Sequence, residues 1–227
     1  LDSLTPLKTE AQFGNAANGQ FSQQIQGNIN LLRGDEISVS TLRNNALGGV
    51  MPMGTAAFEK RGVALEVPEV DMDKCTQCNY CAISCPHAVI RPFLLSQDEF
   101  DIAPSSFDSR KAKGGAEVAG LNFRIQVSPY DCTGCAVCVN TCPDDALRMV
   151  PLADIHTTSS ENWEFGMNKL ADRADRFDKF SLKGSQFQTP LMEFSGACAG
   201  CGETPYIKLV TQLFGNRMII ANATGCS

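Results

Sequence analysis

The sequence has little positive charge and few aromatic residues. Among 227 residues, 19 Lys and Arg stand against 25 Asp and Glu, which gives a formal net charge of −6, and only 7% are aromatic. Nucleic-acid-binding domains usually carry an excess of basic residues, so this balance argues against a nucleic-acid partner. No apolar run approaches the ~20 residues of a membrane span, which argues against a membrane partner as well.

A signal peptide and a disulfide pattern are also missing. The first ten residues, LDSLTPLKTE, contain neither a basic region nor an apolar stretch and do not begin with Met, so we expect them to lie within a longer chain. Eleven cysteines is an odd number, and their gaps of two and three residues differ from the spacing of a secreted disulfide scaffold. These features predict a reducing compartment, either the cytoplasm or an anaerobic organelle.

Two cysteine runs share one spacing. CTQCNYCAISCP begins at Cys75 and CTGCAVCVNTCP begins at Cys132, and both read C-x2-C-x2-C-x3-C-P. This is the run of bacterial ferredoxins, in which three cysteines bind one [4Fe–4S] cluster and the fourth binds the other cluster. A tetrahedral zinc site is the alternative, but it uses two separated pairs of ligands and leaves one cysteine of each run over. We therefore expect one cluster on Cys75, Cys78, Cys81 and Cys142, and a second on Cys132, Cys135, Cys138 and Cys85.

The flanks of the two runs repeat as well. Each run is expected to follow a short strand and to lead through one helical turn into a second strand, and residues 122–127, NFRIQV, form one of these strands, with Phe123, Ile125 and Val127 on one face. Such a half cannot bury its own apolar side, so the two halves should pack on each other. The 46 residues between Cys85 and Cys132 form an insertion.

The remaining segments carry weaker signals. Residues 20–32 are expected to form a short helix, and residues 34–40 a turn and a strand in which Ile37 and Val39 alternate with polar neighbours. Residues 151–188 are polar and receive no function. Near the C-terminus we expect a helix capped by Thr204, with Pro205 at its first position and Gly215 at its end. One side of it should carry Ile207, Val210, Leu213 and Phe214, and residues 218–222, MIIAN, should form a buried strand.

A third cysteine group comprises Cys198, Cys201 and Cys226. A C-x2-C pair with one distant cysteine is three-quarters of a four-thiolate site, although free buried cysteines or a zinc pair fit the spacing equally well. His87 follows a cluster cysteine and could tune a cluster through a hydrogen bond, but we expect a partly exposed residue. His156 and Trp163 are expected to lack partners, and no role is assigned to them.

Four segments resemble one enzyme family. Residues 194–215, FSGACAGCGETPYIKLVTQLFG, and 220–227, IANATGCS, are similar to the start of the thiamine-binding domain of pyruvate:ferredoxin (flavodoxin) oxidoreductases. Residues 53–62, MGTAAFEKRG, and 183–194, KGSQFQTPLMEF, resemble the same family, as does the ferredoxin-like insert. The resemblance covers most of the chain and is weakest over roughly the first 30 residues.

This resemblance implies a third [4Fe–4S] cluster beside thiamine diphosphate. Its ligands would be Cys198, Cys201 and Cys226, with a fourth ligand beyond Ser227, and Glu203 and Cys226 would lie near thiamine diphosphate. The family's magnesium and diphosphate ligands have no counterpart in this sequence. The resemblance further implies oxidative decarboxylation of pyruvate with coenzyme A, electron transfer to ferredoxin or flavodoxin, and a homodimer. We expect the 227 residues alone to be inactive with pyruvate.

The expected fold is α+β. A linker or domain edge over residues 1–52 should precede a ferredoxin-like 2[4Fe–4S] domain with an insertion over 53–171. Residues 172–227 should form the first βα part of an α/β thiamine-diphosphate-binding domain. Two other functions remain open, namely a free-standing two-cluster electron carrier and an oxidoreductase for another 2-oxo acid.

Overall fold

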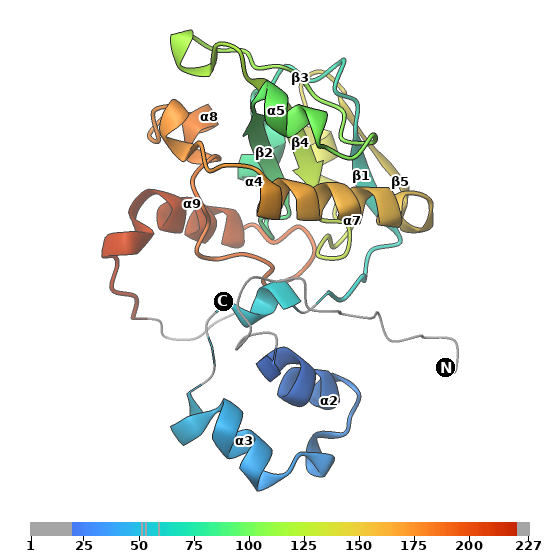
Figure 1. Cartoon of the computed structure of the whole chain (residues 1–227), viewed down its shortest axis with the longest axis vertical. Helices are drawn as coiled ribbons and strands as arrows, with labels where there is room; N and C mark the ends of the chain where they lie inside the picture. Colours follow the sequence, from blue (N-terminus) through green and yellow to red (C-terminus); the bar gives the residue numbers. More distant parts are fainter. Residues whose placement is uncertain (1–19, 51, 53, 59, 222–227) are drawn as a thin grey trace. The chain divides into compact units, whose positions relative to one another are not determined.

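The computed structural model describes residues 20–50, 52, 54–58 and 60–221, and the chain divides into two units, residues 1–61 and 62–227 (Figure 1). The first unit is helical where it is described. Its elements are a π-helical turn (Ser22–Gln26), α2 (Gly27–Asn30), α3 (Val39–Asn45) and three 3-10 turns (Gly34–Glu36, Leu47–Gly49, Thr55–Phe58). The helix expected over residues 20–32 is confirmed.

The strand expected over residues 34–40 is wrong, because this segment enters α3 instead. Ser38 has an extended backbone, and its hydroxyl oxygen accepts a hydrogen bond of 3.1 Å from the amide of Thr41. A serine in this position is a strong helix N-cap. The alternation of Ile37 and Val39 does not reflect a buried face, because Val39 is 80% exposed.

The second unit contains two matching halves. The first half runs through β1 (Glu66–Val70), α4 (Tyr80–Ser84) and β2 (Ile90–Leu95). The second half runs through β4 (Asn122–Val127), α6 (Val137–Thr141) and β5 (Leu147–Pro151). Both halves have the expected order of strand, cysteine loop, helical turn and strand.

Each half pairs its strands with those of the other half. β1 lies antiparallel to β5, with Glu66 opposite Pro151, and β2 lies antiparallel to β4, with Ile90 opposite Val127. The helical turns α4 and α6 also pack together. The apolar side chains of the two halves form one core, which includes Val67, Leu94, Phe123, Ile125 and Leu147. The halves therefore bury each other, as the repeat predicts, and the mixed architecture fits a ferredoxin-like fold.

The insertion between the halves adds one helix and one short strand. α5 (Gln97–Asp101) begins at a capping box, in which Ser96 and Glu99 exchange side-chain and backbone hydrogen bonds. β3 (Arg110–Lys111) pairs with β4 and extends the β2–β4 sheet to three strands. Beyond it the insertion crosses a 3-10 turn, Ala116–Val118, whose Val118 belongs to the core.

A long helix follows the second half, where the sequence analysis placed no element. α7 (Leu152–Lys169) packs against β4 and β5 (Figure 1). Trp163 is buried on it, and its ring meets Phe93 and Phe194 edge-on. Trp163 is therefore a core residue, whereas the sequence analysis expected no partner for it. His156, also on α7, lies 2.9 Å through Nδ1 from the Tyr130 hydroxyl, so that expectation is wrong too.

The C-terminal segment consists of α8 (Leu182–Ser185), α9 (Thr204–Phe214) and a 3-10 turn (Gly215–Arg217). α9 ends at Gly215 as predicted, but its N-cap is Glu203, so Thr204 is its first residue and not its cap. The apolar side expected for α9 is not its most buried side. α9 buries Thr204, Lys208, Thr211 and Gln212, whereas Val210 and Phe214 are 42% and 41% exposed.

The strand predicted for residues 218–222 is absent from the described part, which ends at Ala221. Ile219 is 99% exposed, and no strand of the described residues lies beside it to form hydrogen bonds. An apolar run of this kind becomes a strand only where a neighbouring strand pairs with it. In the described residues, no helix has both the length and the apolar character needed to cross a membrane.

Candidate iron–sulfur centres

The two cysteine loops repeat the same backbone conformation. Gln77 and Gly134, which occupy equivalent positions, have φ angles of 65° and 70°, and Asn79 and Ala136 have φ angles of 66° and 59°. Left-handed conformations at non-glycine residues are uncommon and usually depend on their surroundings. Their recurrence at matching positions shows that the repeat extends to the path of the backbone around the cysteines.

Strand pairing brings cysteines of different runs together. Burial raises the pKa of Cys81, and the nearby thiols of Cys138, Cys75, Cys78 and Cys142 raise it further. Burial likewise raises the pKa of Cys132 to about 12, with contributions from Cys85 and Cys135. The pKa of Cys138 is raised by burial and by Cys85, Cys132 and Cys135. Apart from Cys138, which also adjoins Cys81, the first group joins Cys142 to the first three cysteines of the first run, and the second group joins Cys85 to the first three cysteines of the second run.

Backbone amides point at the sulfur atoms. The amide of Gly134 donates to Sγ of Cys132 at 3.4 Å, and the amide of Ala146 donates to Sγ of Cys142 at 3.3 Å. Such bonds stabilise thiolates bound to iron and help to set cluster potentials. In the described residues, no three His, Cys, Asp or Glu side chains are close enough to hold a single metal ion. In a cubane each thiolate binds its own iron atom, so its ligands lie further apart.

A small cavity lies among the cysteines of the second group. Its lining includes four cysteines, two prolines and two residues with polar side chains: Cys85, Cys132, Cys135, Cys138, Pro68, Pro86, His87 and Thr133. Nε2 of His87 and Oγ1 of Thr133 are buried and have no hydrogen-bond partner within the described part of the chain. Buried polar atoms are nearly always satisfied, so two such atoms in a cysteine-lined cavity fit a cluster whose sulfur atoms accept hydrogen bonds. His87 is 2% exposed, which corrects the expectation of a partly exposed residue.

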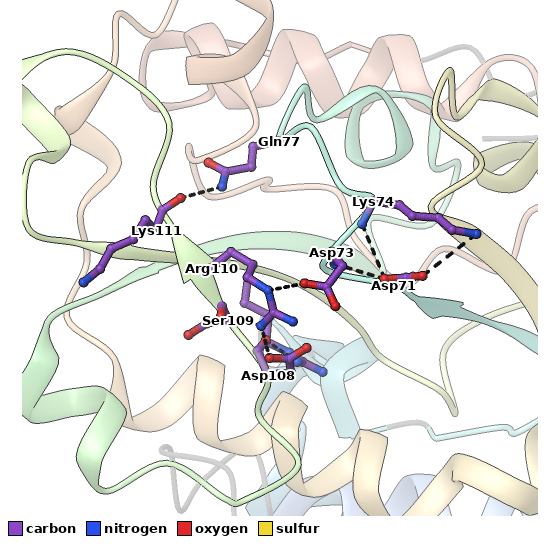
Figure 2. A network of polar contacts seen from close by, with 9 residues as sticks. Asp71, Asp73, Lys74, Gln77, Asp108, Ser109, Arg110 and Lys111 are labelled. Atoms are coloured by element: carbon purple, nitrogen blue, oxygen red, sulfur yellow. Dashed lines mark hydrogen bonds and ion pairs between the residues drawn. The ribbon is translucent and has the colours of Figure 1, made fainter.

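The first cysteine loop is attached to the insertion (Figure 2). Gln77 Nε2 donates to the carbonyl oxygen of Lys111 at 2.8 Å, as Figure 2 shows. The amide of Lys113 in turn donates to Gln77 Oε1 at 2.7 Å. Below this pair, Arg110 Nε donates to Asp73 at 2.7 Å, which lowers the pKa of the Asp73 carboxyl group. The insertion therefore holds the loop that carries Cys75 and Cys78.

The third C-x2-C loop resembles the other two. Gly200 has a φ of 71° at the position equivalent to Gly134. Amides of Thr204 and Glu203 donate to the Cys201 thiol and lower its pKa. Cys201 is half-buried and Cys198 is exposed. A Cβ atom added at Gly200 would lie 3.6 Å from Cβ of Cys135, so this loop borders the second cysteine group. Cys226 lies outside the described residues, and Glu203 occupies the N-cap position of α9.

Two buried cations attach the third cysteine segment, and the sequence analysis missed both. Lys208 on α9 donates to carbonyl oxygens at the end of α4, including those of Ile83 and Cys85 at 3.1 Å each. Burial lowers the pKa of Lys208 to about 8. Arg91 in β2 forms an ion pair with Glu193. Lys208 is the only charged residue of α9, and Arg91 is the only charged residue of β2. A lone charge in an otherwise uncharged helix or strand could have indicated a buried, paired cation.

Comparison with known proteins agrees with this geometry. A family model described as a 4Fe-4S dicluster domain matches residues 68–143, and another, EKR, described as a domain of unknown function, matches residues 9–64. The part of the chain that holds the two cysteine runs is therefore a dicluster iron–sulfur domain.

Proteins that are similar to most of the chain identify its family more closely. The chain is 56% identical over 208 residues to a Cryptosporidium parvum pyruvate dehydrogenase (NADP+) and 48% identical over 238 residues to a Moorella thermoacetica pyruvate:ferredoxin oxidoreductase. It is 50% identical over 209 residues to an Enterobacter agglomerans pyruvate-flavodoxin oxidoreductase. These alignments cover 92%, 100% and 91% of the chain but only 10%, 20% and 17% of the relatives. The chain is thus homologous to a segment of the pyruvate:ferredoxin and pyruvate-flavodoxin oxidoreductases, which confirms the expected resemblance.

Proposed function

We propose that this chain is the electron relay of an oxidoreductase that converts pyruvate and coenzyme A to acetyl-coenzyme A and carbon dioxide. The observation that carries the proposal is the position of the third C-x2-C loop, which borders Cys135 of the second cysteine group. A free-standing two-cluster carrier has no use for such a loop. The relatives' names supply the substrate, because all three contain pyruvate.

The proposed ligands follow the two cysteine groups. Cys75, Cys78, Cys81 and Cys142 would hold one [4Fe–4S] cluster, and Cys132, Cys135, Cys138 and Cys85 the other. Cys198, Cys201 and Cys226 would hold three corners of a third cluster. Thiamine diphosphate with magnesium, when bound by the whole enzyme, supplies the electron sink for decarboxylation. Residues 172–227 would begin the domain that binds it, with Glu203 and Cys226 near the cofactor.

The geometry suggests an order for the relay. The third loop borders the group that contains Cys135, so electrons would pass from the third cluster to this second group first. The link to the remaining group would run between Cys138 and Cys81, because these cysteines lie on α6 and α4, which pack together. The protein's part is to fix these distances and to keep water from the buried thiolates.

The acceptor at the end of this relay is proposed to be ferredoxin or flavodoxin. The relatives' names include both carriers and also NADP+, so similarity in this segment is compatible with different final acceptors. Residues 1–52 would connect this relay to a preceding domain, and the whole enzyme would be a homodimer.

An anaerobic preparation of the chain tests the proposal. We expect about eight iron and eight sulfide per chain for the two complete clusters. The dithionite-reduced chain should pass electrons to ferredoxin or flavodoxin. With pyruvate, coenzyme A, thiamine diphosphate and magnesium it should not reduce a dye, since it corresponds to a fifth or less of the relatives' length. Stoichiometric zinc without sulfide would contradict the relay, and thiamine-dependent turnover by these residues alone would contradict its role as one part of the enzyme.

The remaining alternatives are separated in the longer protein. We expect pyruvate to support dye reduction by the full-length enzyme far better than other 2-oxo acids. A preference for another acid would change the substrate but keep the relay. Electron transfer unaffected by Cys198→Ala and Cys201→Ala in the full-length enzyme would instead favour a two-cluster carrier that does not use the third loop.

A further inference from the structure

We propose that Nε2 of His87 donates a hydrogen bond to a sulfur atom of the cluster held by Cys85, Cys132, Cys135 and Cys138, and that this bond raises the cluster's reduction potential. The inference rests on the proposed function, because it assumes that these cysteines hold a cluster. It adds a residue that makes no bond to iron but acts on the cluster through its sulfur atoms.

The position of the ring is the first argument. His87 is 2% exposed and lines the cavity that the four cysteines surround. Its Nε2 is buried and has no partner among the described residues. A buried donor without an acceptor costs about 1–3 kcal/mol, so a native structure normally provides the acceptor. Four cysteines line this cavity, and the Thr133 hydroxyl, which also lines it, makes no hydrogen bond to His87, so a sulfur atom is the acceptor that fits.

The second argument is the opposite ring nitrogen. Nδ1 of His87 lies 3.1 Å from the carbonyl oxygen of Ser195 and 3.3 Å from the Ser195 hydroxyl. The amide of Phe194 donates to the carbonyl oxygen of His87 at 2.8 Å. These contacts fix the ring plane and leave Nε2 as the atom that faces the cavity.

The negative charge of the cluster favours the forms of the His87 ring that carry a proton on Nε2. If Nδ1 accepts from the Ser195 hydroxyl, the neutral ring carries its proton on Nε2. If Nδ1 donates to the Ser195 carbonyl oxygen and the ring is positively charged, Nε2 carries a proton as well. The third form, neutral with the proton on Nδ1, would aim a lone pair at a cluster with net negative charge and is disfavoured. Reduction adds another negative charge to the cluster, so a donor stabilises the reduced form more strongly and raises the potential.

Ser195 also places this ring between two cysteine groups. It lies three residues before Cys198, so the contact that orients His87 comes from the third cysteine segment. His87 thus contacts the third cysteine segment through Nδ1 and faces the second cluster through Nε2. A shift of the third loop would therefore move the ring and alter its hydrogen bond to the cluster sulfur.

Substitutions of His87 that remove one or both of its polar ends test the inference in the cluster-loaded protein. His87→Leu removes both nitrogen atoms, His87→Asn keeps a polar group near the Ser195 end, and His87→Gln extends one toward the cavity. The measurement is a redox titration followed by electron paramagnetic resonance, with iron and sulfide determined for each protein. The control is His156→Asn, because His156 binds Tyr130 and does not line the cavity.

At a given ambient potential, we expect the Leu and Asn variants to have a ratio of reduced to oxidised second cluster about tenfold lower than the wild type. This corresponds to a shift of about −59 mV in the midpoint potential of a one-electron couple. The Gln variant and the control should stay within about threefold of the wild type. Should the Leu variant fail to assemble its clusters, the comparison of Gln with Asn decides, and equal potentials for these two overturn the inference. Full clusters with an unmoved potential in the Leu variant also overturn it and leave the relay intact. A wild-type protein without iron and sulfide overturns the proposed function and this inference together.

Discussion

Lys208 Nζ donates a hydrogen bond of 3.1 Å to the carbonyl oxygen of Cys85. The same ammonium group also donates to the carbonyl oxygens of Ala82 and Ile83, so one buried cation satisfies the C-terminal end of α4. A cation is favoured there because the helix dipole places negative charge at that end. Since Lys208 lies on α9, this contact holds the third cysteine segment against the first cysteine run.

Lys208→Met should therefore loosen α9. The substitution keeps most of the apolar volume but leaves three buried carbonyl oxygens without their charged donor, which we expect to cost about 3 kcal/mol. Hydrogen exchange of the α9 amides, measured on the cluster-loaded protein, should become much faster, and the urea midpoint should fall. The control is Lys179→Met, since Lys179 contacts the last turn of α9 from a more exposed site, and its effect should stay near 0.5 kcal/mol. Equal effects of the two substitutions would argue against a special role for Lys208.

Crossed ligation predicts which cluster each cysteine serves. Cys85→Ala should damage the cluster of Cys132, Cys135 and Cys138 and spare the cluster of Cys75, Cys78 and Cys81. Cys142→Ala should do the reverse, because the fourth cysteine of each run lies beside the first three cysteines of the other run. Electron paramagnetic resonance of the reduced variants distinguishes the two signals. Loss of the sequence-local cluster in both variants would contradict the crossing.

Gln77 offers a test of the contact between the first loop and the insertion. Gln77→Ala removes both hydrogen bonds to the insertion and leaves a non-glycine residue at a φ of 65°, whereas Gln77→Gly removes the bonds but relieves the backbone. We expect a loss of about 2–3 kcal/mol for Ala and about 1 kcal/mol less for Gly, as measured by denaturant unfolding under anaerobic conditions. Lys111→Ala is the control, because only the backbone of Lys111 takes part. If Ala proves no worse than Gly, the left-handed conformation is not maintained in solution.

Once iron is removed, the free energy of unfolding should fall as the pH rises above 9. In the folded apoprotein, burial raises the pKa of Cys132 from 9.0 to about 12. A raised thiol pKa contributes stability that is complete below pH 9 and is lost as pH rises toward 12, because the unfolded chain releases its proton first. We expect the apoprotein to unfold more easily across this range in urea titrations, and the cluster-loaded protein to be much less sensitive, since its cysteines are already deprotonated. The same dependence in both forms would argue against these thiols as iron ligands.

The two cysteine halves could be predicted because their signals are local. Run spacing, the following proline and the flanking apolar residues all lie within a few positions of one another, so neither long-range contacts nor burial has to be known. The left-handed angles at Gln77 and Ala136 could not be predicted, because neither residue type favours them. They follow from the way the loops turn around their cysteines.

On α7 and α9 the sequence did not reveal the buried side chains, because several of them are polar. α7 packs through Ser159 and Asn162 as well as Trp163, and the polar pair is satisfied by Gln126 and Ser106, so hydropathy does not reveal the buried face. On α9 the apolar stripe of Val210 and Phe214 is partly exposed, while Lys208 reaches the end of α4 and the buried Thr211 accepts a hydrogen bond from the amide of Leu191. Periodicity shows that a helix has two faces, but the partner decides which of them is covered.

The crossing of strands and cysteines has a consequence for synthesis on the ribosome. Cys75, Cys78 and Cys81 leave the ribosome long before Cys142, so the first three thiols must wait for the second half. β1 likewise waits for β5, with which it pairs. During that interval the nascent chain exposes reactive thiols and an unpaired strand edge, which favours oxidation and aggregation. With the proposed crossed ligation, neither cluster can be completed until the second half has left the ribosome, so both sites would be filled at the same stage of synthesis.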